Sequence, residues 1–184
     1  FETSKVTEMS HMFDNCISLR FADVSRFDTQ LVINFSYMFN QCSSLLRIDV
    51  TNFNTAKVKD MTSFFKGCSS INTLNVANFD TSEVEYMNDM FSSCKYVKSL
   101  DVSKFNTKKV LTMSKMFYEC FYLEEINLKN FYTTNVIGYE KIIFFFVLVF
   151  WKKNIDICRK SFYFINNTTN KRGVNGKRNR KNGC

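Results

Sequence analysis

Apolar and polar residues follow two different periods within one short stretch of this chain. Ile48 and Val50 alternate with polar neighbours, which is the period of a half-buried strand. Over residues 58–71, apolar side chains instead recur every three or four positions, at Val58, Met61, Phe64, Phe65, Cys68 and Ile71. This spacing places the side chains on one stripe of a helix. The pattern therefore predicts a strand, a turn, a short helix and a second turn.

The same pattern recurs every 26 residues, without an insertion or a deletion. The phenylalanine column is Phe1, Phe27, Phe53, Phe79, Phe105 and Phe131. The cysteine column is Cys16, Cys42, Cys68, Cys94 and Cys120, and the threonine column is Thr3, Thr29, Thr55, Thr81, Thr107 and Thr133. A unit of this size cannot bury its own apolar side, so neighbouring units must stack on each other. We expect five complete repeats and the start of a sixth, with the phenylalanine and cysteine columns in the core.

The spacing of Leu45, Ile48 and Val50 is that of a leucine-rich repeat. We therefore expect an α/β leucine-rich-repeat solenoid, with parallel strands on its concave face and short helices on its convex face. Thr55 and its equivalents directly precede the expected helix. A hydroxyl at this place can cap the free N–H groups of the helix, so the threonine column is interpreted as a set of helix caps.

One repeat carries the motifs Phe79-Asp-Thr-Ser-Glu-Val84, Met87-Asn-Asp-Met-Phe-Ser-Ser-Cys94 and Leu100-Asp-Val102. It resembles the BspA-type leucine-rich repeat family, and the resemblance covers residues 1–136. The resemblance implies a non-catalytic surface protein that binds protein or glycan ligands in adhesion to a host or matrix. It also implies a place at the cell surface or outside the cell. The alternatives are an intracellular protein–protein interaction scaffold and a truncated, non-functional gene fragment.

Polar positions between the buried columns are expected to line the concave face. The candidate ligand-binding residues are Arg47, Asp49, Thr51, Thr73, Asn75, Ser99, Asp101, Glu125 and Asn127. They include an Asp/Asn column, for which hydrogen bonding to neighbouring backbone is the structural alternative. A second acidic column, Glu2, Asp28, Asn54, Asp80 and Asn106, is expected to close Asx-type turns into the helices.

The five cysteines in register are interpreted as buried free thiols, with occasional disulfides as the alternative. Packed helices lie about 8 to 10 Å apart, which is too far for most disulfides. A 26-residue spacing without histidine is not a zinc signature. His11 is the single histidine of the chain, which argues against histidine-dependent catalysis, and we expect it to be packed or solvent-exposed. No enzyme activity, cofactor or metal is therefore expected.

The formal net charge of +8 lies at one end of the chain. Residues 1–136 carry 14 basic and 15 acidic side chains, whereas residues 137–184 carry 11 and 2. We predict a repeat array over residues 1–136, a degenerate sixth repeat or apolar capping helix over 137–151, and a basic, disordered or frameshifted tail over 152–184. The basic stretch from Lys171 to Lys181 has no stacking aromatics, so no specific nucleic-acid partner is expected.

The apolar run from Ile142 to Trp151 is too short to cross a membrane, and interfacial association of residues 142–184 is kept as an alternative. Glycosylation sequons occur at Asn34, Asn166 and Asn167. The chain starts at a repeat boundary with Phe1, so we expect it to be a fragment of a longer protein.

Overall fold

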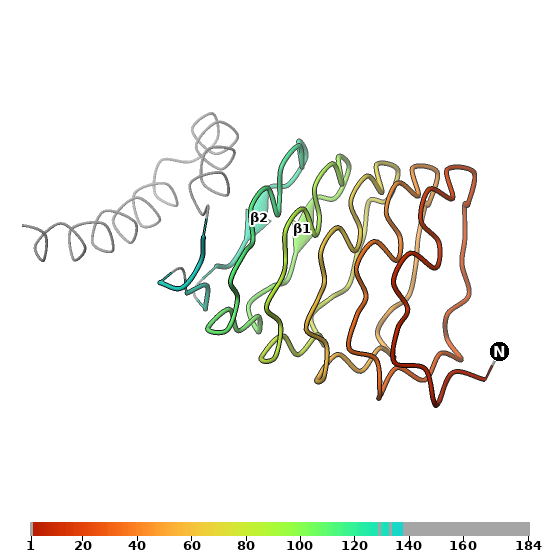
Figure 1. Cartoon of the computed structure of the whole chain (residues 1–184). Helices are drawn as coiled ribbons and strands as arrows, with labels where there is room; N and C mark the ends of the chain where they lie inside the picture. Colours follow the sequence, from red (N-terminus) through yellow and green to blue (C-terminus); the bar gives the residue numbers. More distant parts are fainter. Residues whose placement is uncertain (1, 129, 133, 138–184) are drawn as a thin grey trace, which may run out of the picture. The chain divides into compact units, whose positions relative to one another are not determined.

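The computed structural model describes residues 2–128, 130–132 and 134–137 of the chain. The chain divides into two compact units, Phe1–Phe145 and Phe146–Cys184, and every described residue lies in the first. Within that unit, successive 26-residue repeats lie side by side (Figure 1). Apart from Ile137, the predicted segments 137–151 and 152–184 lie outside the described residues, and so do the sequons at Asn166 and Asn167.

The expected α/β leucine-rich-repeat solenoid is wrong. Among the described residues there is no helix, and the strands are only β1 (Ser99–Leu100) and β2 (Glu125–Ile126). These two strands pair in parallel, with Ser99 beside Glu125 and Leu100 beside Ile126. The rest of each described repeat is turn and coil. The concave sheet and the convex helices on which the sequence interpretation placed its residues are therefore absent from this part of the chain.

Residues in the left-handed conformation explain why the apolar stripe is not a helix. Two columns have positive φ values, of 55–60° at His11, Tyr37, Ser63, Asp89 and Lys115 and of 57–74° at Asn15, Gln41, Gly67, Ser93 and Glu119. A right-handed helix cannot continue through such residues. Short turns form instead, in which the N–H of Phe64 donates to the carbonyl of Met61 at 3.3 Å and that of Cys68 to the carbonyl of Phe65 at 3.1 Å. The spacing of three and four residues thus comes from successive turns.

Backbone hydrogen bonds in this segment join neighbouring repeats. The N–H groups of Met61, Ser63, Phe65 and Gly67 donate to the carbonyls of Tyr86, Asn88, Met90 and Ser92 at 2.8–2.9 Å. The same register, from residue i to residue i+25, recurs at each junction between Met9 and Tyr118. A line of isolated parallel bridges through Glu8, Asn34, Asp60, Tyr86 and Thr112 borders it. Each repeat therefore satisfies its backbone groups only when it has neighbours.

The prediction of a core made of phenylalanine and cysteine columns is confirmed. Phe53, Phe79 and Phe105 are at most 2% exposed, and four cysteines are buried. A second aromatic column, Phe13, Phe39, Phe65, Phe91 and Phe117, stacks ring on ring with centroids 5.1 to 6.1 Å apart. Because the rings of adjacent repeats are in contact, burial of each phenylalanine depends on the next repeat.

The threonine column is buried, but the helix-cap interpretation is wrong because no helix follows it. The Oγ1 atom of Thr55 accepts a hydrogen bond from the N–H of Asp80 at 2.8 Å and donates one to the Asp80 carbonyl at 2.9 Å. The same pair of bonds joins Thr29 to Asn54 and Thr81 to Asn106. Each of these hydroxyls therefore clamps the backbone of the following repeat.

Candidate binding surface

The Asp/Asn column of the candidate residues forms Asx turns. Oδ1 of Asp49 accepts hydrogen bonds from the Thr51 hydroxyl at 2.6 Å and the Thr51 N–H at 3.0 Å. These bonds hold the pKa of the Asp49 carboxyl below its ordinary value. Asn75 and Asp101 accept from the N–H groups two residues later in the same way. Hydrogen bonding to neighbouring backbone, the structural alternative from the sequence, is confirmed for these three side chains.

The second acidic column also forms Asx turns, as predicted, but these turns lead into no helix. Asp28, Asn54, Asp80 and Asn106 each accept a hydrogen bond from the N–H group two residues later, at 2.9–3.2 Å. The aspartate and asparagine columns therefore hold the turns of the repeat, and their side-chain oxygens are engaged within the array.

The nine candidate residues occupy three equivalent positions in successive repeats. Arg47, Asp49, Thr51, Thr73, Asn75, Ser99, Asp101 and Asn127 are exposed. Parallel pairing places Phe21 beside Arg47 and Ser99 beside Glu125, so neighbouring repeats bring these positions together. The result is an exposed surface, built mainly of coil and turn, in place of the expected concave sheet. We call these nine residues the Arg47 surface.

Arg47 is held in place by an aromatic neighbour in the preceding repeat. Its guanidinium carbon lies 5.0 Å from the centre of the Phe21 ring, and that ring is 52% exposed. A guanidinium over an aromatic face gains a cation–π interaction. This contact orders the long arginine side chain at the surface and leaves its charge available to a ligand.

Four exposed aromatic side chains were not predicted from the sequence. Tyr96 and Tyr122 are 53% and 52% exposed and stack with their centroids 5.2 Å apart and their planes 17° apart. Phe121 is 52% exposed, and Tyr118 is 42% exposed with the Lys115 ammonium 5.8 Å from its centroid. We call Tyr96, Tyr118, Phe121 and Tyr122 the aromatic cluster. Comparing each repeat position across the array could have found them, since earlier repeats carry serine where Tyr96 and Tyr122 stand.

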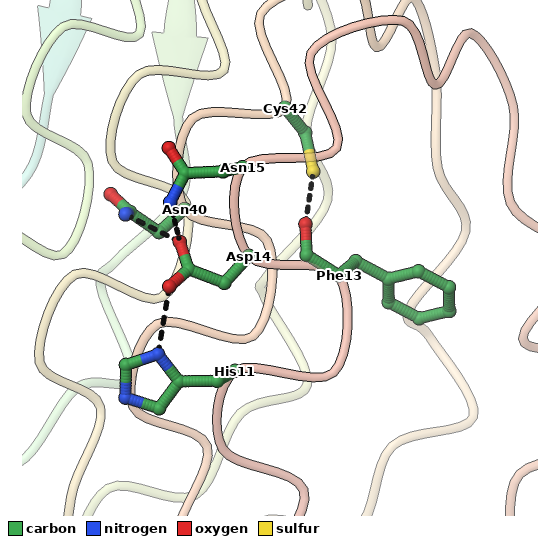
Figure 2. A network of polar contacts seen from close by, with 6 residues as sticks. All are labelled: His11, Phe13, Asp14, Asn15, Asn40 and Cys42. Atoms are coloured by element: carbon green, nitrogen blue, oxygen red, sulfur yellow. Dashed lines mark hydrogen bonds and ion pairs between the residues drawn. The ribbon is translucent and has the colours of Figure 1, made fainter.

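A polar network around Asp14 joins the first two repeats (Figure 2). One carboxylate oxygen lies 2.8 Å from Nδ1 of His11, and the other accepts from the amides of Asn15 and Asn40 at 3.0 and 2.7 Å. The hydrogen bond from His11 is the main reason that the pKa of Asp14 is lowered. His11 also stacks on Tyr37, with centroids 4.7 Å apart. The histidine is exposed, as one of the two predicted alternatives has it, and its contacts connect repeats.

The described cysteines are free, and Cys42, Cys68, Cys94 and Cys120 are buried, as predicted. Each of these four thiols donates to a carbonyl 29 residues earlier at 3.1–3.2 Å, as Figure 2 shows for Cys42 and Phe13. Burial raises the pKa of Cys42 to about 11 and that of Cys120 to about 12. Thiolate chemistry is therefore suppressed at these sites.

Two further searches cover the described part of the chain. No group of three or more histidine, cysteine, aspartate or glutamate side chains lies close enough there to hold a metal ion. Residues 2–137, as far as they are described, include no helix with the length and apolar character needed to cross a membrane. A shallow, open depression of about 420 Å³ lies beside Arg26, Asp28 and Asn52, away from the candidate residues in sequence.

The chain belongs to the family described as Mycoplasma protein of unknown function, DUF285. This family matches residues 1–74 and, in a second match, residues 44–147. No curated protein and no solved structure matches the chain. The two family matches together cover the repeats, and their description assigns no function.

Proposed function

We propose that this member of the DUF285 family is a non-catalytic binding module of the surface-protein type, which takes a protein or glycan ligand on the Arg47 surface. One observation carries the proposal: positions of the repeat fall into two kinds. The threonine, cysteine, asparagine and aspartate columns keep their residue type and are engaged in hydrogen bonds within the array. The exposed position of Arg47 instead changes from Phe21 to Arg47, Thr73, Ser99 and Glu125.

This division of roles is what a binding scaffold needs. The fixed columns hold the backbone, so the side chain at the variable position can change without loss of a framework hydrogen bond. A rigid framework that presents varied side chains supports binding, because little conformational entropy is lost when the ligand docks. The resemblance of the repeat to BspA-type surface proteins supports a place at the cell surface or outside the cell.

The alternative is an intracellular interaction scaffold that uses the same surface. One observation favours it: the five cysteines among the described residues are all free, which suits a reducing compartment. Protease treatment of intact cells distinguishes the two. Loss of the repeats from intact cells supports the surface protein, and protection until lysis supports the scaffold.

Charge reversal on the Arg47 surface tests the proposal. The triple variant Arg47→Glu, Thr73→Glu, Ser99→Glu changes three exposed side chains for which no framework hydrogen bond is found. We expect it to lose binding to the immobilised glycans or matrix proteins that the native chain retains, with an unchanged midpoint of thermal unfolding.

A matched control introduces three glutamates elsewhere on the exposed surface, at Gln30, Lys57 and Lys108. This control should bind like the native chain. Binding by the folded Arg47 triple variant at the native level would contradict the proposal.

A further inference from the structure

The aromatic cluster departs from the repeat in a way that the framework does not explain. The position of Tyr96 and Tyr122 is serine in the earlier repeats, at Ser18, Ser44 and Ser70. The Ser70 hydroxyl donates to the carbonyl of Ser43 at 2.6 Å, so serine ties this position to the preceding repeat. A tyrosine hydroxyl, at the far end of its ring, cannot make that short bond. The two tyrosines therefore replace a framework hydrogen bond with half-exposed aromatic surface.

The backbone beneath the cluster is fixed by pairing between repeats. The N–H of Tyr122 donates to the carbonyl of Lys95 at 3.1 Å, and the N–H of Glu124 donates to the carbonyl of Lys98 at 2.8 Å. Strands β1 and β2 follow directly and continue the pairing. Tyrosine side chains on such a support offer a large contact area at a low entropy cost, as in antibody binding sites.

The orientation of the rings favours a polypeptide over a sugar. Because Tyr96 and Tyr122 stack with planes 17° apart, each turns one face toward the other. A sugar packs its C–H groups on an open aromatic face, and these two faces are occupied. The exposed parts include ring edges and hydroxyls. Aromatic edges carry partial positive charge and pair with aromatic faces, and hydroxyls donate to the carbonyl oxygens of a peptide backbone.

The size of the surface also fits a protein partner. The Arg47 surface and the aromatic cluster, together with Phe21, extend over five repeats. At about 4.8 Å per paired repeat this is a length of about 19 Å. A similar width gives an area of the same order as the roughly 800 Å² that each partner contributes to a standard protein interface. Tyrosine and arginine are the residue types that dominate binding energy in such interfaces.

We propose that the aromatic cluster anchors a polypeptide ligand. An aromatic or aliphatic side chain of the ligand packs against the edges of Tyr96 and Tyr122, and ligand carbonyls accept hydrogen bonds from the tyrosine hydroxyls. The proposal rests on the binding function proposed above and narrows its ligand from protein or glycan to protein.

Selection from a random peptide library on the full 184-residue chain tests this inference. We expect the selected peptides to be enriched in aromatic and large aliphatic residues. The double variant Tyr96→Ser, Tyr122→Ser restores the serine of the earlier repeats, so it should fold like the native chain. Fluorescence anisotropy should show that this variant binds the selected peptides about tenfold more weakly or worse.

Tyr86→Ser is the matched control, since Tyr86 is 38% exposed and lies on the line of bridges through Asp60 and Thr112. It should bind within about twofold of the native chain. Equal peptide binding by the native chain and the double variant would overturn the inference, as would the absence of any enriched peptide.

A panel of neutral and acidic glycans separates this inference from the proposed function. Glycan binding that is lost in the Arg47 triple variant but kept in the tyrosine double variant would leave the proposed function standing and overturn the inference. Glycan binding that is lost in the tyrosine double variant would overturn the choice of a polypeptide. Failure of peptides, glycans and matrix proteins alike to bind would overturn both proposals.

Discussion

At the scale of single residues, the repeated side chains are those that connect one repeat to the next. The Thr55 hydroxyl contacts both backbone groups of Asp80, and the Cys94 thiol contacts the carbonyl of Phe65. Both atoms are buried, where an unpaired partner would cost about 1 to 3 kcal/mol. The cysteine column thus does more than fill space, because each buried thiol closes a polar contact that valine or alanine would leave open.

These thiols predict a loss of stability at alkaline pH. Burial raises the pKa of Cys94 well above its ordinary value, so the folded chain holds this proton more tightly than the unfolded chain. The stabilisation is complete below the unfolded pKa of about 8.5 and is lost as pH rises above it. Removing the thiol in Cys94→Ala should make the fall in unfolding free energy shallower by up to about 1.4 kcal/mol per pH unit.

Denaturant unfolding between pH 7 and pH 11 measures this difference. Cys94→Ala should be less stable than the native chain at neutral pH, because it also loses the hydrogen bond to Phe65. Cys16→Ala is the control, since Cys16 is only half-buried. Parallel pH profiles for the native chain and Cys94→Ala would show that the thiol contributes no such dependence.

At the scale of the repeat, the sequence revealed the period and the buried columns but not the backbone conformation. Apolar spacing reports which side chains point inward, and Met61, Phe64 and Cys68 do point inward. It does not distinguish a helix from successive turns that bury the same residues. The left-handed positions gave no warning, because they are filled by residues such as Tyr37, Ser63 and Lys115 and only once by glycine. The aromatic cluster escaped prediction because it interrupts a column.

The left-handed column makes a prediction of opposite sign for two buried serines. Ser63 has a φ of 56°, a conformation that costs a non-glycine residue about 1 to 2 kcal/mol. Ser63→Gly removes this cost against a glycine penalty of about 0.5 to 1 kcal/mol, so it should stabilise the chain by up to about 1 kcal/mol. Ser36 is also buried but is not in this conformation, so Ser36→Gly should destabilise the chain.

Denaturant unfolding of both serine variants provides the comparison. A shift in the same direction for both would mean that left-handed strain at Ser63 does not limit stability. The result would also show whether the turns that replaced the expected helix are under strain or are relaxed by their hydrogen bonds to the next repeat.

At the scale of the described array, every ladder depends on a constant 26-residue step. Stacked phenylalanines, threonine clamps and backbone bonds all join residues 25 to 29 positions apart. Removing residues 53–78 deletes one whole step and brings Phe79 to the place of Phe53, so every column closes again. We expect this chain to unfold cooperatively at a lower temperature, as an array with fewer neighbour contacts should. Removing only residues 53–65 breaks every column at the junction and should abolish cooperative unfolding. Thermal unfolding followed by circular dichroism distinguishes the two deletions, and equal damage from both would mean that stability does not come from repeats stacked in register.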